Sequence, residues 1–421
     1  MDQKTFQAVL YVFFGILFLG GFLSLSLYGY FKKAEQDEGR SATVFPNIVI
    51  WGTFDAKEMA VVSKQLSRGR GEDKGYNNVR YVEKDPSTVR SAFIQAAATG
   101  QAPDLLLLDH RTLLTLRENL RVIPFSAFPL AQYQRTFIPA SDQFVVQGGY
   151  LGFPFLADTM VLYYNENLRL RDGIKDIPTT WSEFSSGALA SVIKRHQATD
   201  RSVIPLGSYS NYQHAIELLS ALVLQTKESD AGLTAPALQE ALEFYTSFSN
   251  LRSSVFTWNV SLPQARDLFV ANNLIFYPGF ISEYQELIRS NPNIVVRVAP
   301  IPQIGSGATP VTPAVIHTLG IAATSKQPTA ALSVILDLLS ILQEEETGFL
   351  DRFPAPPALQ GFYPDAESDV TETIFISSLF DARAIPLTPE QQRQLITILQ
   401  EIVVGSRSYA SGVETLLRFY Q

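Results

Sequence analysis

Three short apolar runs alternate with two helical patterns in the first part of the chain, and this alternation restricts the possible folds more than any other feature. Strands are predicted at residues 47–51, 79–82 and 104–108, and the last of these contains four consecutive leucines. A strand that is apolar on both faces is typical of a parallel sheet covered on both sides. Asp85 and Pro86 provide an N-cap and a first-turn proline for the helix before the third strand. The order strand–helix–strand–helix–strand therefore predicts an α/β fold with right-handed crossovers.

The length of the chain predicts more than one lobe, because 421 residues exceed the size of an ordinary single core. Strand and helix signals continue along the chain, with strands at residues 160–164 and 274–277. Between them, the sequence T-W-S-E at residues 180–183 is a capping box that opens a helix. We therefore expect a second α/β lobe after the first.

The composition excludes several classes of function. Hydrophobic residues make up 46% of the chain and charged residues 18%, as in globular proteins. A net charge of -8 without a basic block argues against a nucleic-acid binder. The absence of cysteine excludes disulfides, thiolate metal sites, cysteine nucleophiles and a lipid-modified N-terminal Cys. The four histidines lack metal-ligand spacing, and no nucleotide or hydrolase motif occurs, so we expect no metal, cofactor or catalysis.

The N-terminal segment is apolar, and residues 5–31 contain no charged side chain. About 20 such residues suffice to cross the hydrocarbon core of a bilayer. We therefore predict a transmembrane anchor at residues 1–31 and a polar linker at residues 32–43. The alternative is a cleaved signal peptide, with Ser24 and Ser26 as small residues at a cleavage site, although the apolar region of such peptides is usually only about 7–15 residues long.

Two segments in the middle of the chain resemble a known family. Residues 149–165 read GYLGFPFLADTMVLYYN, and residues 178–184 read PTTWSEF. Together they resemble the lobe-crossing strand that runs into L-Y-Y-N, and the P-x-T-W-x-E-F element, of family 1 extracellular solute-binding proteins of the maltose-binding-protein type. The resemblance extends from about Asn47 to the C-terminus. The chain departs from the family at Asn273, where Lys is usual, and at Phe280, where many sugar-binding members have Trp.

The resemblance implies an α/β fold of the two-lobed, periplasmic-binding-protein-like type II class, preceded here by the N-terminal transmembrane helix. The two lobes would be discontinuous in sequence, with one crossing at residues 153–159. We assign residues 44–155 and 298–345 to the first lobe, and residues 156–297 and 346–421 to the second. Ligand would bind between the lobes, and a hinge would close around it.

The implied function is that of an extracytoplasmic solute-binding protein of an ABC importer. Such a protein delivers a small polar ligand, here expected to be a sugar or oligosaccharide, to the permease subunits. We expect a monomer attached to the cell membrane by a single span. Taken literally, the positive-inside rule would place the large domain in the cytoplasm, because Lys32, Lys33 and Arg40 follow the apolar segment. The family resemblance favours the extracytoplasmic side instead.

Candidate ligand-binding residues follow from a rule for open α/β sheets, in which ligands bind beyond the carboxyl ends of the strands. Aromatic rings there could pack on the C–H faces of a sugar, and carboxylates could accept hydrogen bonds from its hydroxyls. The candidates are Trp51, Thr53, Phe54, Asp109, His110, Asp158, Thr159, Tyr209, Tyr212, Trp258, Tyr277 and Phe280. Each also has a purely structural interpretation, since Trp51 could be a core residue and Asp109 could cap the helix that begins at His110.

Two other functions stay open at this point. A membrane-tethered sensor or adhesion module could keep the fold without transport. A carbohydrate-active enzyme is also possible, because the pair of carboxylates that cleaves glycosidic bonds is defined by distance in space rather than by spacing in sequence.

Overall fold

A computed structural model describes residues 46–68, 78–197, 201–226, 234–305, 309–344, 353–360, 370–385 and 387–420. These residues belong to one compact unit, Pro46–Gln421. The predicted membrane anchor at residues 1–31 and the linker at residues 32–43 lie outside the described residues. None of the helices within the described ranges combines the length and the apolar character that a membrane span requires.

The first part of the chain forms the predicted parallel sheet. Its strands are β1 (Asn47–Gly52), β2 (Asn78–Glu83) and β3 (Leu105–Asp109), and both β2 and β3 pair with β1 in parallel. Helices α2 (Ala56–Arg68) and α3 (Val89–Ala98) connect them. The four leucines of β3 are fully buried, as expected for a strand covered on both faces.

The central strands of the sheet come from distant parts of the sequence. Strand β10 (Thr312–Ile321) is antiparallel to β3 on one side and to β7 (Phe153–Asn165) on the other. Helix α12 (Pro328–Glu344) then packs against β1, α2 and β10. At Gly152 the backbones approach so closely that an added Cβ would lie 2.7 Å from the carbonyl oxygen of Leu319. This close approach explains the glycine in the segment that resembles the family.

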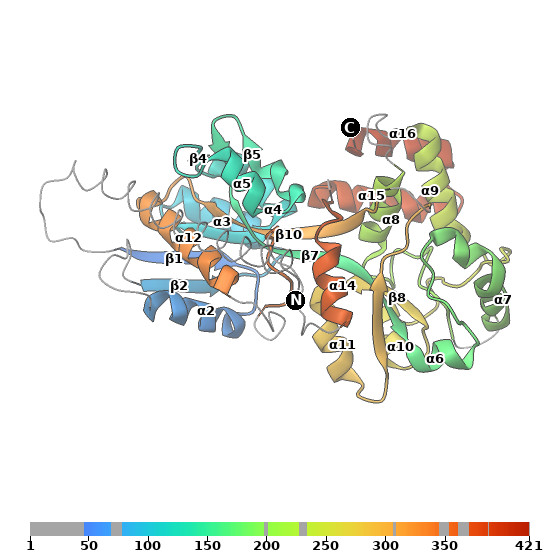
Figure 1. Cartoon of the computed structure of the whole chain (residues 1–421). Coiled ribbons are helices and arrows are strands. Elements are labelled where there is room, and N and C mark those ends of the chain that lie inside the picture. The colour runs from blue at the N-terminus through green and yellow to red at the C-terminus, as the bar shows by residue number, and fades with distance from the viewer. Residues whose placement is uncertain are drawn as a thin grey trace, which may run out of the picture. The chain divides into compact units, whose positions relative to one another are not determined.

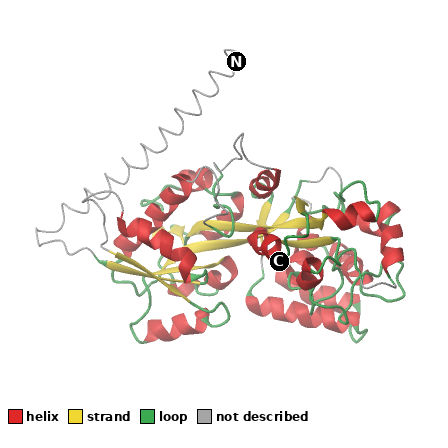
Figure 2. Cartoon of the chain, turned by 90° about the horizontal axis from the view of Figure 1, so that it is seen from below, coloured by secondary structure: helices red, strands yellow, loops and turns green. Residues whose placement is uncertain are grey.

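Strand β7 changes its partners halfway along its length. Up to Thr159 it pairs with β10, and from Met160 it pairs with β8 (Phe276–Phe280) and β9 (Val296–Pro300). The strand order is β2-β1-β3-β10-β7-β8, with β9 also on β7 and β11 (Ala382–Ala384) on β10. Figure 1 shows one group of elements at each end of β7 and β10, and Figure 2 shows the strands running between these groups.

The first group contains β1, β2, β3, α2, α3 and α12, together with the elements between β3 and β7. These are α4 (His110–Leu114), α5 (Leu130–Thr136) and a small sheet of β4 (Ile123–Pro124), β5 (Val145–Val146) and β6 (Gly149–Tyr150). Residues 353–360 also join this group, because Pro357 bridges to Leu156 and Leu359 bridges to Phe137.

The second group contains β8, β9 and most of the helices that follow β7. Its helices are α6 (Glu166–Arg171), α7 (Gly187–His196), α8 (Ala215–Gln225), α9 (Ala235–Ser247), α10 (Ala265–Val270), α11 (Tyr284–Ser290), α15 (Pro389–Val403) and α16 (Tyr409–Tyr420). The C-terminal helices belong here because α16 packs on α9 and α15 packs on α8. Helix α14 (Val370–Ser378) packs against β7 and β9.

The burial of β3 leads to a prediction about stability. Leu108 is fully buried in the core of the first group, so Leu108→Ala is expected to lower the free energy of unfolding by about 2–5 kcal/mol. Urea unfolding of the full chain, followed by circular dichroism, measures this loss. The matched control is Ile94→Ala on α3, where the side chain is 41% exposed and the expected change is about 0.5 kcal/mol or less. Equal losses in both variants would contradict the assignment of β3 to the core.

Candidate functional site

Three predicted residues lie at the carboxyl end of β1, where their side chains are partly exposed. Trp51, Thr53 and Phe54 are all of intermediate exposure. The Lys84 ammonium group lies 3.8 Å from the centroid of the Trp51 ring. The ring of Phe54 packs on His317 with 4.6 Å between centroids. This edge of the first group therefore offers aromatic surface beside polar groups.

Asp109, at the end of β3, caps helix α4. Its carboxylate accepts hydrogen bonds from the backbone N–H groups of Arg111 and Thr112 and from the Thr112 hydroxyl. The Arg111 Nε also lies 3.1 Å from Asp109 Oδ1. Burial alone would raise the pKa of Asp109, but the charges of Arg111 and His110 and the Thr112 hydrogen bond lower it to about 2. Asp109 is therefore a fixed anion that holds Arg111 in place.

Arg111 also reaches across to the second group. Its Nη1 lies 3.0 Å from Oε1 of Glu217, and the two side chains are only 18% and 13% exposed. Glu217 lies in the first turn of α8, whereas Arg111 lies on α4. Neither residue was predicted, because no local sequence pattern connects two positions that are 106 residues apart.

A second polar cluster lies in the second group around Glu283. His214 Nε2 lies 2.7 Å from Glu283 Oε2, and the Phe280 backbone N–H donates to the same oxygen. The Tyr277 hydroxyl and the Gln213 amide donate to Oε1. Burial opposes ionisation of both partners, but their hydrogen bond lowers the pKa of Glu283 and raises the pKa of His214. The predicted residues Tyr277 and Phe280 thus position a carboxylate that the sequence alone does not reveal.

Asp158 lies on β7, next to the point where that strand changes partners. Its side chain is buried, and its Oδ1 accepts a hydrogen bond from the Ser282 backbone N–H at 3.1 Å. Burial is the main cause that raises the pKa of Asp158 to about 7, and the charge of Glu283 adds to it. A carboxyl group that titrates near neutrality at such a position is typical of a functional site.

These groups interact as one set, which we call the junction cluster. Its members are Asp109, Arg111, Asp158, His214, Glu217 and Glu283. The charge of Asp158 acts on His214, that of Glu217 acts on both His214 and Arg111, and Asp109 and Arg111 form an ion pair. The cluster lies where the first and second groups meet, beside β7.

Four other predicted residues have buried side chains whose polar atoms bond within the protein. His110 accepts from the Ile316 N–H at Nδ1 and donates to the Ile385 carbonyl from Nε2. Thr159 bonds to the Ser378 hydroxyl. The Tyr212 hydroxyl donates a hydrogen bond to the Pro278 carbonyl, and the Trp258 indole N–H donates one to the side-chain oxygen of Asn211. These placements favour packing roles over ligand contact for the four side chains. Tyr209 is partly exposed.

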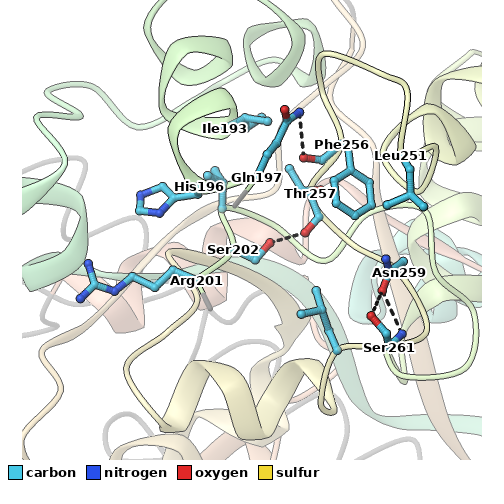
Figure 3. Close-up of a pocket in the computed structure, with 12 residues that line it drawn as sticks. Ile193, His196, Gln197, Arg201, Ser202, Leu251, Phe256, Thr257, Asn259 and Ser261 are labelled. Carbon is cyan, nitrogen blue, oxygen red and sulfur yellow. Dashed lines mark hydrogen bonds between the residues drawn. The ribbon is translucent and has the colours of Figure 1, made fainter. Parts of the chain in front are cut away.

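A cavity of about 280 Å³ lies within the second group, and none of the predicted residues lines it. Figure 3 shows its wall, where the Ser202 hydroxyl donates to the Thr257 carbonyl and the Gln197 amide donates to the Phe256 carbonyl. These bonds join protein groups to one another and so tie the loop at residues 253–257 to α7 and to the chain that follows it. Among the described residues, no group of three or more His, Asp and Glu side chains is placed to hold a metal ion.

Comparisons with known proteins give a family and a fold. The model of a family described as bacterial extracellular solute-binding protein matches residues 71–346, which is more than half of the chain. The solved structure of the sugar-binding protein MalE from Xanthomonas citri has 19% identity and a TM-score of 0.67, over 89% of this chain and 96% of that one. The maltose-maltodextrin binding protein of Alicyclobacillus acidocaldarius has 21% identity and a TM-score of 0.64, over 89% of this chain and 100% of that one.

A third solved structure is an ABC transporter solute-binding protein from Thermotoga lettingae, bound with α-D-tagatose. It has 18% identity and a TM-score of 0.67, over 89% of this chain and 100% of that one. Comparison with curated proteins gave no match. At these identities the similarity establishes the fold, which is a mixed α/β fold like that of MalE-type binding proteins.

The hydrogen bonds of His110 lead to a prediction about stability. His110→Leu would leave the Ile316 N–H and the Ile385 carbonyl unpaired in a buried site, and each unpaired group costs about 1–3 kcal/mol. We expect urea unfolding to report a loss in that range or above it. The control is His317→Leu, because Nδ1 of His317 is buried without a partner and the same replacement breaks no bond at that atom. A larger loss at His317 would contradict the structural role of His110.

The raised pKa of Asp158 predicts an unusual pH dependence. The folded value of about 7 lies above the value near 4 of an unfolded Asp, so the folded state binds the proton more tightly, and stability falls as pH rises from 4 to 7. Asp158→Asn removes this penalty, and we expect it to raise the free energy of unfolding at pH 8 by about 4 kcal/mol, with little change at pH 4.

Urea unfolding at the two pH values measures the effect of Asp158→Asn. Asp109→Asn is the control, and we expect it to lower the free energy of unfolding at pH 8. The lowered pKa of Asp109 means that its ionised form stabilises the folded state above pH 4, and the amide cannot ionise. If Asp158→Asn were destabilising at pH 8, the buried and unfavourable state of this carboxylate would be disproved.

Proposed function

Because this chain belongs to the family of bacterial extracellular solute-binding proteins, we propose that it binds a sugar or oligosaccharide between two lobes and delivers it to an ABC importer. Family membership confirms the predicted resemblance and the prediction of a binding protein rather than an enzyme. The choice of ligand is supported by structural neighbours that are themselves sugar-binding, maltose-maltodextrin-binding or tagatose-bound proteins.

The proposed lobes correspond to the two groups of elements. Support comes from β7, which pairs with β10 up to Thr159 and with β8 and β9 from Met160. We keep residues 44–155 in the first lobe and residues 160–297 with the C-terminal helices in the second. The rest of β9 up to Pro300 joins the second lobe because β9 pairs with the second half of β7, so the first lobe resumes after Pro300 and continues to residue 345. Residues 156–159 pair with β10 and form the crossing between the lobes. Residues 353–360 bridge to Phe137 and Leu156, so we add them to the first lobe.

The proposed ligand site is the junction cluster with the aromatic side chains on either side of it. This arrangement is the observation that carries the proposal. Phe54 and Trp51 lie on the first-lobe side, and Phe280 and Tyr277 lie on the second-lobe side. Sugars present apolar C–H faces to rings and hydroxyl groups to carboxylates, and both kinds of partner occur here. Of the predicted residues, we retain Trp51, Thr53, Phe54, Asp109, Asp158, Tyr209 and Phe280 as candidate contacts. Tyr277 is fully buried and its hydroxyl donates to Glu283, so we assign it the role of positioning that carboxylate.

We further propose that residues 1–31 anchor the protein to the membrane with the lobes on the extracytoplasmic side. The support is the uncharged run at residues 5–31 and a family whose members are extracellular. A protein anchor also fits a chain without cysteine, which cannot carry a lipidated N-terminal Cys. The proposed partners are the permease subunits, and the proposed state is a monomer.

A thermal-shift screen of the full chain in mild detergent tests the proposed ligand class. The panel contains monosaccharides, maltose, maltotriose, polyols, amino acids and short peptides. A ligand present at 100 times its dissociation constant stabilises the folded state by about 2.7 kcal/mol, which raises the melting temperature. We expect at least one sugar to raise the melting temperature. The increase should be smaller in the Phe280→Ala variant and unchanged in the Ile94→Ala control. A shift with peptides or amino acids and with no sugar would refute the sugar assignment.

A further inference from the structure

Arg111 bridges two carboxylates that lie on opposite sides of the junction. Its Nε lies 3.1 Å from Asp109 on its own side, and its Nη1 lies 3.0 Å from Glu217 on α8. We infer that the Arg111–Glu217 ion pair holds the two lobes together in the absence of ligand and so favours the closed form, which makes these two residues positioning residues for ligand binding. The inference rests on the proposed lobes and the proposed binding function.

The guanidinium group of Arg111 is held in place by its own lobe. Asp109 caps α4 and is fixed by hydrogen bonds from the Thr112 N–H and hydroxyl. The Asp109 carboxylate in turn accepts hydrogen bonds from the backbone N–H and the Nε–H of Arg111. A planar guanidinium that is already oriented loses less side-chain entropy when it meets a second carboxylate. Arg111 is thus prepared for Glu217 before the lobes close.

Glu217 is held on the opposite side by a rigid element. It lies in the first turn of α8, where a carboxylate interacts favourably with the helix dipole. The residues that follow it, from Leu218 to Val223, are all buried, and α8 packs on α9 and α15 of the second group as well as on β10. Because both partners are fixed to their own lobes, the distance between their charged atoms depends on the separation of the lobes.

The environment of the pair makes it stronger than an ordinary surface ion pair. Its side chains are 18% and 13% exposed, whereas those of the surface pair Arg393–Glu390 are 72% and 62% exposed. Charges shielded from water attract each other more strongly and are screened less by salt, and the hydrogen bonds between Arg111 and Asp109 offset part of the cost of removing the pair from water. Opening the lobes would separate the two charges and expose both to water. The pair therefore shifts the ligand-free protein toward the closed form, which raises apparent ligand affinity through the larger competent fraction.

The absence of native cysteine allows the lobe separation to be measured directly. Gln95→Cys on α3 and Glu240→Cys on α9 place one exposed label on each lobe of the full chain. Distances between spin labels are then recorded without ligand, in the parent and with Glu217→Gln added. We expect Glu217→Gln to move the distribution toward longer distances. We also expect apparent affinity for the sugar found in the screen to fall about 10-fold, or about 1.4 kcal/mol.

Two comparisons separate the pair from other effects of mutation. Glu390→Gln removes the acid of the exposed pair and should leave both the distance distribution and the affinity unchanged. The double variant Arg111→Gln, Glu217→Gln should open the lobes no further than Glu217→Gln alone, because the same interaction is lost. If Arg111→Gln disturbs folding through the unpaired Asp109, Glu217→Gln still carries the test.

The outcome can be read independently of the ligand assignment. If no sugar binds but Glu217→Gln still lengthens the distances, the ion-pair inference stands and the proposed ligand class fails. If a sugar binds and Glu217→Gln leaves the ligand-free distances as in the parent, the inference is overturned and the proposed function survives. An equal lengthening in Glu390→Gln would also overturn the inference, because the effect would then belong to net charge rather than to this pair.

Discussion

The pairing of β7 is the constraint on which the rest of the structure depends. One strand of 13 residues satisfies its backbone hydrogen bonds with β10 over its first half and with β8 and β9 over its second half. Backbone groups that are buried must find such partners, so the strand ties the two groups of elements together at fixed register. The change of partners at Thr159 and Met160 also places Asp158 and the neighbouring loops at the junction. The fold thereby brings the polar side chains of the junction cluster to the place where the two groups of elements meet.

The junction is also where the protein tolerates unfavourable electrostatics. Asp109 and Glu283 are stabilised as anions by Arg111 and His214, whereas burial raises the pKa of Asp158 to about 7. A core position of that kind costs stability, since an apolar or amide side chain would avoid the desolvation. Proteins retain such costs mainly at functional sites. The contrast among these three carboxylates is physical support for a binding role at this junction.

Local patterns in the sequence predicted the elements well, because they depend on near neighbours. The apolar run at β3 and the capping box at Thr180 were placed correctly from periodicity and turn chemistry. The strand predicted at residues 274–277 is β8, but it runs from Phe276 to Phe280, because Pro278 and Gly279 pair with β7 instead of ending the strand. The capping role of Asp109, one of two interpretations open from sequence, is the one found. The contacts of the site were not predictable in this way. Arg111 pairs with Glu217, and His214 pairs with Glu283, across large separations in the sequence, so these contacts exist only in the folded protein. Burial of His110 and Trp258 likewise depends on distant segments, which is why both appeared equally suited to ligand contact.

The position of β10 has a consequence for how the protein assembles during synthesis. This strand lies between β3 and β7, yet it begins at Thr312, after all the strands and most of the helices of the second group have been made. Until it emerges from the ribosome, β3 has an open edge of unpaired backbone groups, and such edges are prone to wrong pairing. Helices α15 and α16 complete the other half later still. Neither half can therefore finish before most of the chain exists, so we expect slow maturation governed by long-range contacts rather than two successive, independent folding events.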